Sequence, residues 1–166
     1  MELRFGPNDI LMIDDARIIF RNFAGEASQY NREGKRKFSV VIPDEAIAEQ
    51  LKNHVNEDGA SWNVKIKPPR DVDDTPLMFM DVNVRFNQYG PAVYLVSDGV
   101  QRPLNEESVG ILDKISIEKV DMDIRPFDNV TSGKAYRTAY LQSIKVYQRE
   151  NRYDRFAMSP DVVDEY

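Results

Sequence analysis

F-R-N-F-A-G-E-A-S-Q-Y-N-R-E-G-K-R-K-F, residues 20–38, alternates aromatic and basic side chains around two glycines, in a chain whose formal net charge is -6. Its basic residues are Arg21, Arg32, Lys35, Arg36 and Lys37, and its aromatic residues are Phe20, Phe23, Tyr30 and Phe38. Rings that stack on bases, beside cations that bind phosphates, are what a binder of single-stranded nucleic acid requires. An ordinary hairpin, with solvated charges at its tip and core aromatics in its two strands, explains the same pattern.

The segments on either side of this stretch predict two strands joined by a long loop. Residues 10–23 are rich in Ile and Phe without a helical repeat, and Asp14 and Asp15 mark a turn or bulge among them. Residues 24–34 have the Gly, Ser, Asn and Gln content of a loop, and residues 35–42 resume as a strand. We therefore expect a first hairpin that is long and basic at its tip.

One helix is predicted over residues 44–58. Asp44 can cap its free backbone amides, and Ile47, Leu51 and Val55 form one apolar face that we expect to cover the sheet. Gly59 suits the left-handed conformation at which many helices end.

Most of the remaining sequence predicts alternating strands. Residues 61–67 place Trp62, Val64 and Ile66 inside and Lys65 and Lys67 outside. Residues 77–88 direct one face of the strand into the core and the other outward, and we expect a hairpin with residues 92–97. The inward residues are Met78, Met80, Val82, Val84 and Phe86, and the outward residues are Leu77, Phe79, Asp81, Asn83 and Arg85.

The last third of the sequence predicts a short helix or turn over residues 106–113, a strand over 114–125 with a bulge, a loop over 126–133 and a strand over 135–150.

Together, the predicted elements are those of a mainly β protein. We predict an antiparallel barrel of five to seven strands resembling the oligonucleotide-binding (OB) fold, with one α-helix, and a β-sandwich is the alternative.

The composition bounds the function. The 166 residues fit a single domain over 1–150, followed by a flexible acidic tail over 151–166. There is no cysteine and one histidine, His54, which excludes thiolate chemistry and a multi-histidine metal site within one chain. No apolar run is long enough for a membrane helix, and no secretion signal is present, so we expect a cytoplasmic protein without a cofactor.

Cations lie beside aromatic rings in later segments too: Trp62 with Lys65 and Lys67, Arg125 with Phe127, and Lys134 and Arg137 with Tyr136 and Tyr140. Each group alone is explained better by a core ring next to a surface charge, and it is their repetition along the chain that favours a nucleic-acid-binding surface. Carboxylates supply a different hypothesis. Asp121 and Asp123 project from one strand face, and Asp71, Asp73 and Asp74 share a loop, so a Mg²⁺-dependent nuclease or resolvase is an alternative.

The succession F-R-N-F-A-G…Y-N-R-E-G-K-R-K-F, W-N-V-K…P-P-R, I-R-P-F and A-Y-L resembles the single-stranded DNA-binding proteins of tailed bacteriophages and their prophages, over about residues 16–150. The resemblance implies an OB barrel that coats single-stranded DNA without sequence preference during phage replication and recombination. It also implies that the protein is not an enzyme, needs no metal and acts in the bacterial host.

Carried over by position, the resemblance and the basic-aromatic pattern give one set of DNA-binding candidates. They are Arg21, Asn22, Phe23, Tyr30, Arg32, Lys35, Arg36, Lys37, Trp62, Lys65, Lys67, Arg70, Tyr136 and Arg137. Replication or recombination proteins of the phage or host are further candidate partners through the acidic tail, and self-association stays open. A phage structural or host-interaction protein that uses the same surface is the remaining alternative.

Overall fold

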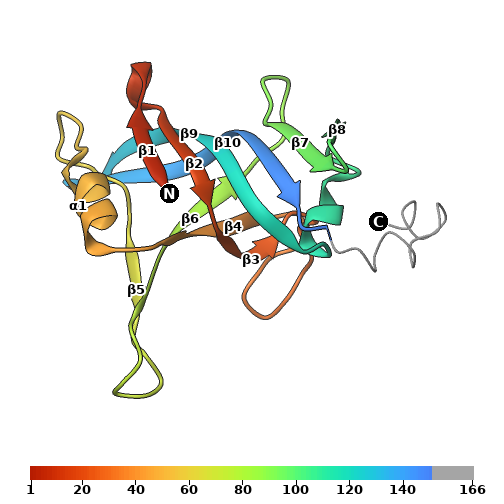
Figure 1. The fold of residues 1–166 in the computed structure, drawn as a ribbon. Helices are drawn as coiled ribbons and strands as arrows, with labels where there is room; N and C mark the ends of the chain where they lie inside the picture. Colours follow the sequence, from red (N-terminus) through yellow and green to blue (C-terminus); the bar gives the residue numbers. More distant parts are fainter. Residues whose placement is uncertain (151–166) are drawn as a thin grey trace.

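The structure is a computed structural model, and it describes residues 1–150. Its sheet contains ten strands among these residues, together with one α-helix and two short 3-10 helices (Figure 1). The elements are β1 (Glu2–Phe5), η1 (Pro7–Asp9), β2 (Leu11–Ala16), β3 (Ile18–Asn22), β4 (Arg36–Ile42), α1 (Glu45–Asn53), β5 (Lys65–Lys67), β6 (Leu77–Val84), β7 (Ala92–Ser97), β8 (Val100–Leu104), η2 (Val109–Asp113), β9 (Ile117–Thr131) and β10 (Lys134–Gln148).

The chain segment that contains β2 and β3 joins both ends of the sheet. Its first half pairs with β9 and its second half pairs with β4, because the strand bends at Asp15, whose φ is 56°, where the register shifts. From β4 the order continues through β6, β10 and β9. The sheet therefore returns to the segment where it began, and the bend expected at Asp14 and Asp15 is confirmed.

The pairings along this ring are those of an OB barrel. If the β2–β3 segment counts as strand one, then β4, β6, β9 and β10 are strands two to five, and the ring order is 1-2-3-5-4. All pairs are antiparallel except that of β6 with β10, which meet in parallel at Asn83 and Tyr140. The predicted mainly β, OB-like class is thus confirmed, with more strands than the five to seven expected.

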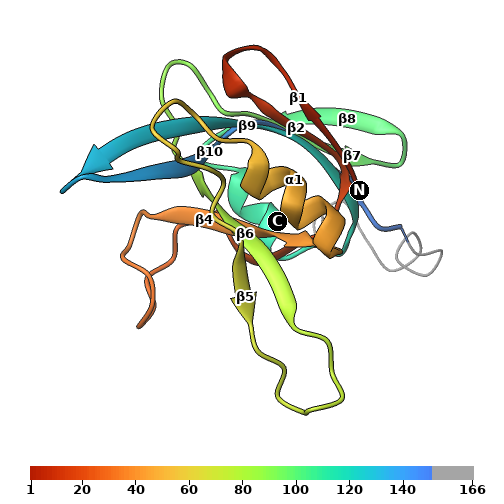
Figure 2. The ribbon, with the colours of Figure 1, turned by 90° about the vertical axis from the view of Figure 1, so that its left-hand side faces the viewer.

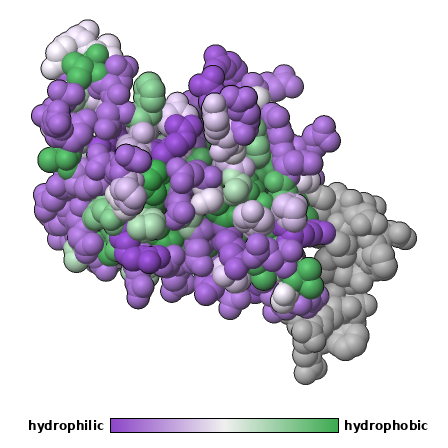
Figure 3. Space-filling view, turned by 90° about the horizontal axis from the view of Figure 1, so that it is seen from above, coloured by the Kyte–Doolittle hydropathy of each residue, from purple (hydrophilic) through white to green (hydrophobic). Residues whose placement is uncertain are grey.

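The interior of the ring is apolar. Alternate residues of β6, of the first half of β9 and of much of β10 are buried, among them Val82 and Ile124, which are fully inaccessible. The inward face predicted for residues 78–86 is confirmed, since Met80, Val82 and Val84 are buried and Met78 and Phe86 pack against the core. Seen from above, the surface is mostly hydrophilic, with small hydrophobic patches rather than one broad apolar face (Figure 3).

Helix α1 begins as predicted and ends early. The Asp44 side chain accepts a hydrogen bond from the amide of Ile47, and Leu51 is buried. The helix stops at Asn53 rather than at residue 58, because the next residues form a turn in which the Asn56 side chain accepts from the amides at 58 and 60. Val55, expected on the buried face, is therefore 54% exposed.

Three expectations about strands were wrong. Residues 61–67 form a strand only over β5, where Ile66 is 57% exposed, since β5 pairs with β6 on one side alone. β6 does not form a hairpin with β7, because β7 pairs in parallel with β10 and in antiparallel with β8. β9 continues through Pro126 to Thr131, where a loop was expected, because it pairs with β10 along almost its whole length.

Three hairpin or loop segments project from the barrel around β4 and β6. Figure 2 shows them leaving the body in different directions: the end of the β9–β10 hairpin to the left, the loop between β3 and β4 to the lower left, and the β5–β6 hairpin downward. In an OB fold the face of strands two and three, with the loops that follow strands one and four, binds oligonucleotides. In this chain those parts are β4, β6, the 23–35 loop and the end of the β9–β10 hairpin.

Candidate nucleic-acid interface

An opening in the barrel lies between β6 and β10. The edge of β6 that faces β10 pairs with β5 at residues 77–79 and with β10 at Asn83, so the backbone between these contacts is not covered by a strand. A cavity of about 220 Å³ occupies this position, and its lining includes the cations of Lys35, Lys37, Lys65 and Arg137 and the carboxylate of Asp81. We call it the β6–β10 cavity.

Asp81 holds one of these cations in place. Its carboxylate accepts hydrogen bonds from Lys65 Nζ at 2.7 Å and from Ser39 Oγ at 2.6 Å. Burial alone would raise the pKa of Asp81, but these hydrogen bonds and the nearby charges of Lys65 and Lys37 lower it, so the carboxylate stays ionised. Lys65 is therefore fixed at the rim of the β6–β10 cavity.

Lys35 and Lys37 have no such partner. Within residues 1–150, no carboxylate lies within ion-pair distance of either ammonium group. Uncompensated cations on a protein of net charge -6 are suited to an anionic ligand.

The 23–35 loop that carries Lys35 is held by its own polar contacts. The buried Asn31 side chain donates hydrogen bonds to the carbonyl oxygens of Glu26, Arg32 and Lys35. The two glycines of the stretch meet across the loop, where the amide of Gly34 donates to Gly25 O at 2.8 Å. A Cβ atom at Gly25 would lie 3.1 Å from the carbonyl carbon of Gly34, and φ is 70° there, so glycine is required.

A row of polar and aromatic side chains crosses four strands on the outer face. Strand register pairs Lys37 of β4 with Asn83 of β6, Asn83 with Tyr140 of β10, and Tyr140 with Arg125 of β9. The Arg125 guanidinium lies 5.0 Å from the centre of the Tyr140 ring. The row therefore places one cation at each end, with a ring between them. We call it the outer row.

Further rings flank the outer row. Phe20, whose φ of 53° marks the register shift of β3, is 53% exposed and contacts Phe79 edge to face at 5.6 Å. Phe127 is 54% exposed and contacts Tyr140 edge to face at 6.3 Å. Exposed rings beside unpaired cations are the arrangement that stacking on bases and binding phosphates requires.

Two of the rings among the sequence candidates are in the core. Phe23 is fully buried and stacked on Phe38 at 5.1 Å, and Trp62 is 2% exposed. The backbone amide of Phe23 donates to the Asp113 carboxylate, which ties the start of the 23–35 loop to η2. These two rings are not available to stack on a nucleobase in this structure, and we leave them out of the proposed interface.

Three polar candidates shape the backbone around the 23–35 loop. Arg21 donates hydrogen bonds to the carbonyl oxygens of residues 112 and 115 at 2.7 and 2.8 Å, and Arg36 donates to that of Phe23. The Asn22 side chain exchanges hydrogen bonds with the backbone of Glu26. Arg21 and Arg36 therefore hold the backbone in place near the loop. Only the other basic residues of the stretch are free to bind a ligand.

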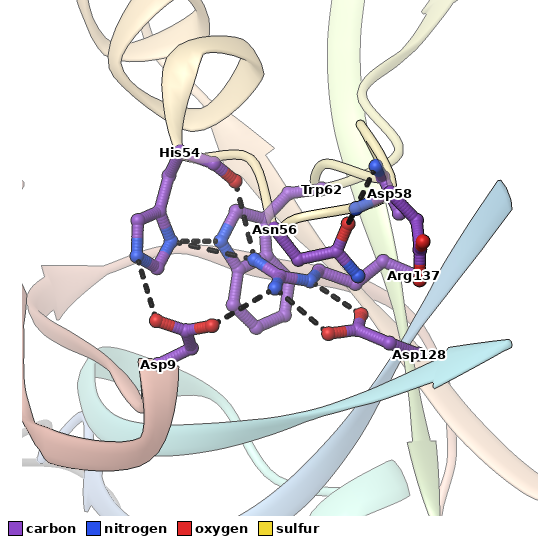
Figure 4. A network of polar contacts seen from close by, with 8 residues as sticks. Asp9, His54, Asn56, Asp58, Trp62, Asp128 and Arg137 are labelled. Carbon is purple, nitrogen blue, oxygen red and sulfur yellow. Dashed lines mark hydrogen bonds and ion pairs between the residues drawn. The ribbon is translucent and has the colours of Figure 1, made fainter.

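Arg137, whose side chain is buried, is at the centre of a polar network that includes the partly exposed carboxylates of Asp9 and Asp128 (Figure 4). Its guanidinium makes two hydrogen bonds to Asp128, at 2.7 and 2.9 Å, and one to Asp9 at 3.2 Å. It also donates to the carbonyl oxygen of His54 and lies 5.0 Å from the centre of the Trp62 ring. The hydrogen bond from Arg137 lowers the pKa of Asp128 against the opposing effect of burial, so the pair is ionised.

This network connects four separate segments of the chain. Trp62 Nε1 donates to His54 Nδ1 at 2.9 Å, so the neutral imidazole carries its hydrogen on Nε2, which lies 3.5 Å from Asp9 Oδ1. Burial is the main cause of a lowered His54 pKa, and the neighbouring Arg137 charge adds to it. The network therefore joins η1, the end of α1, the loop before β5 and the β9–β10 hairpin, and we interpret Arg137 as a structural residue.

The remaining sequence candidates are accessible. Tyr30 is 84% exposed and Tyr136 is 47% exposed. The accessible basic residues lie in the 23–35 loop, at the start of β4 and in the β5–β6 hairpin. They are Arg32, Lys35, Lys37, Lys65, Lys67 and Arg70. Phe79 and Asn83 were missed as candidates, although the alternation of residues 77–88 had placed both on the outer face.

A ring of five β-strands in OB order, with cations and exposed rings on its outer face, defines an oligonucleotide-binding class of protein. The family comparison agrees with this class: the model of the family described as "Putative phage ssDNA-binding domain" matches residues 3–165. The chain belongs to this family. No curated protein matches it.

Two solved structures are similar to the chain. The first is the single-stranded DNA-binding protein from bacteriophage Enc34 with a C-terminal truncation, at 14% identity and a TM-score of 0.53, covering 90% of this chain and 97% of that one. The second is the same phage protein in complex with single-stranded DNA, at 14% identity and a TM-score of 0.50, covering 86% and 88%. At this identity the likeness concerns the fold.

Proposed function

We propose that the protein binds single-stranded DNA without sequence preference and coats it during phage DNA replication and recombination, in the cytoplasm of the bacterial host. Membership of the phage family supports the ligand class. The solved relative in complex with single-stranded DNA shares the fold. No helix within residues 1–150 has the length and hydropathy to span a bilayer.

The observation that carries the proposal is the combination of unpaired cations and exposed rings on the outer face of β4, β6 and β10. Lys35 and Lys37 have no carboxylate partner within residues 1–150, and Arg125 contacts only a ring. Phosphates bound by these groups release counterions, which favours binding at low salt. Rings such as Phe20 stack on any base, because every base has a π face.

The proposal is tested by titrating the protein into labelled oligo-dT and following fluorescence anisotropy. With about three phosphate contacts, from Lys35, Lys37 and Arg125, the logarithm of the binding constant should fall with the logarithm of salt concentration at a slope of about 2. Oligo-dA and mixed sequences should bind with similar affinity, and duplex DNA should compete weakly. A lack of saturable binding at low salt would overturn the proposal.

The nuclease hypothesis is tested in the same assay. Asp121 accepts a hydrogen bond from the amide of Asp15, and Asp123 accepts one from Ser143 Oγ. Within residues 1–150, no three His, Cys, Asp or Glu side chains are grouped so that they could hold a metal ion. Membership of the phage family supports a binding protein without catalysis, so labelled DNA should stay intact with Mg²⁺ or Mn²⁺. Cleavage that disappears in Asp121→Asn would contradict this.

A further inference from the structure

A second cavity lies beyond the end of β6 and is larger than the β6–β10 cavity. Its volume is about 540 Å³, and its walls come from the β6–β7 connection and from neighbouring residues of β9 and β10. The side chains that matter for its chemistry are Arg85, Asn87, Tyr89, Arg125 and Gln142. No carboxylate contributes to the lining. We call it the Arg85 cavity.

The charge of the Arg85 cavity is positive and uncompensated. Neither Arg85 nor Arg125 has a carboxylate within ion-pair distance among residues 1–150. Arg85 is exposed, and Arg125 lies over the Tyr140 ring, which orients its guanidinium. Two guanidinium groups that share a cavity offer the paired N–H donors that phosphate oxygens accept.

Tyr89 presents an exposed ring at the same cavity. It is 87% exposed, yet the turn that carries it is well ordered by hydrogen bonds. The amide of Asn87 donates to Gly90 O at 2.8 Å, the amide of Gly90 donates to Asn87 O, and the amide of Tyr89 donates to the Asn87 side chain. A ring held out from a closed turn loses little conformational freedom when it stacks on a ligand.

The Arg85 cavity continues the outer row. Arg125 belongs to both, and Arg85 is an exposed residue directly after the end of β6, two positions beyond Asn83. A single strand that lies across Lys37, Asn83 and Tyr140 would meet the Arg85 cavity as it leaves the barrel face. The volume of the cavity is sufficient for a nucleotide, while the polar groups at its walls match a phosphate and a base.

We propose that the Arg85 cavity is a second contact site for the same DNA strand, in which Arg85 and Arg125 bind a phosphate and Tyr89 stacks on a base. This inference rests on the proposed function and extends it, because it predicts how the affinity depends on the length of the DNA. Short oligonucleotides fill the outer row alone, whereas longer ones reach the Arg85 cavity as well.

The test compares the double variant Arg85→Ala, Tyr89→Ala with wild type over an oligo-dT series from about 4 to about 16 nucleotides, the range of OB-fold site sizes. Arg125 stays unchanged, since it also serves the outer row. The shortest oligonucleotides that bind should do so with unchanged affinity. The longest should bind about tenfold more weakly, with a salt slope lower by about 0.7 for the lost phosphate contact.

Arg102→Ala is the matched control, because Arg102 is an exposed arginine of β8 outside both cavities. This variant should change neither the affinity for oligo-dT nor the salt slope. An equal loss at all lengths, or no loss at any length, would overturn the second site. If wild type binds single-stranded DNA and only the length effect is missing, this inference alone fails. If wild type does not bind at all, the proposed function fails with it.

Discussion

Arg137 and Arg125 each lie 5.0 Å from the centre of an aromatic ring, yet the structure gives them different roles. The Arg137 side chain is fully buried and bound by Asp128, Asp9 and the His54 carbonyl. Arg125 is half-buried, and within residues 1–150 its guanidinium has the Tyr140 ring as a partner and no carboxylate. A cation beside an aromatic ring in the sequence therefore does not identify a ligand site. Whether the cation is free to bind a ligand depends on its burial and on its carboxylate partners.

The largest effect is expected at the buried arginine. Arg137→Ala removes a guanidinium that carries at least five contacts in the network and leaves the carboxylates of Asp128 and Asp9 without it, so we expect a loss of about 3 kcal/mol in the free energy of unfolding. Arg125→Ala should cost less than about 1 kcal/mol. Urea denaturation of both variants measures the difference in the free energy of unfolding. Equal losses of stability would contradict the different roles assigned to Arg137 and Arg125.

The second expected effect concerns the unpaired lysines. In the double variant Lys35→Glu, Lys37→Glu, two phosphate contacts are lost, each a charge-assisted bond of about 1.5 kcal/mol, so the affinity for oligo-dT should fall about 100-fold. The urea midpoint should fall only slightly, because Lys35 is exposed and neither lysine has an ion-pair partner among residues 1–150, while the half-buried Lys37 charge acts on Asp81 from beyond ion-pair distance. Lys52→Glu with Lys114→Glu, at exposed positions outside both cavities, makes the same change in net charge and is the control for nonspecific charge effects.

A third effect separates an exposed ring from a buried one. Phe20→Ala should weaken oligo-dT binding about tenfold, the value of one stacked base, with little change in stability. Phe23→Ala, three residues later, should instead destabilise the fold by about 3 to 5 kcal/mol, because Phe23 is fully buried. Anisotropy and urea denaturation assign each ring, and a binding defect in folded Phe23→Ala alone would reverse the assignment.

The smallest effect is a pH dependence of stability. Burial lowers the pKa of His54 below its usual 6.5, so the unfolded state binds the proton more readily. Stability should be complete above pH 6.5, decrease as the pH falls below that value, and level off once the folded-state pKa is passed. His54→Gln should flatten the curve between pH 7 and 5, since His54 is the only histidine. A stability that rises on acidification would contradict the burial of the neutral ring.

The sequence predicted the features that depend on neighbouring residues. The cap at Asp44, the alternation of β6 and the bend at Asp15 are local, and the structure has each of them. The parallel pairing of β7 with β10 and the continuation of β9 through Pro126 depend on strands far apart in the chain, which no local pattern specifies.

The candidate site divides in the same way. Alternation placed Lys65 on an outer face, and the basic-aromatic stretch supplied Lys35 and Lys37; the structure brings all three to one cavity. Arg137 could not be recognised as structural, because its partners Asp9 and Asp128 come from other segments. Phe79 was placed outward, and an aromatic residue on a polar strand face was the available signal. The proposed acidic tail, 151–166, lies outside the described residues.

The central claim is that DNA binds the outer face of β4, β6 and β10 and not the buried cluster around Arg137. A titration with oligo-dT followed by two-dimensional ¹H–¹⁵N NMR tests it directly, because Trp62 is the only tryptophan and its indole N–H gives one isolated signal. We predict large shifts for the amides of Lys37, Asp81 and Asn83 and a nearly constant Trp62 indole signal. A strongly shifted indole signal with unmoved β4 and β6 amides would contradict the account.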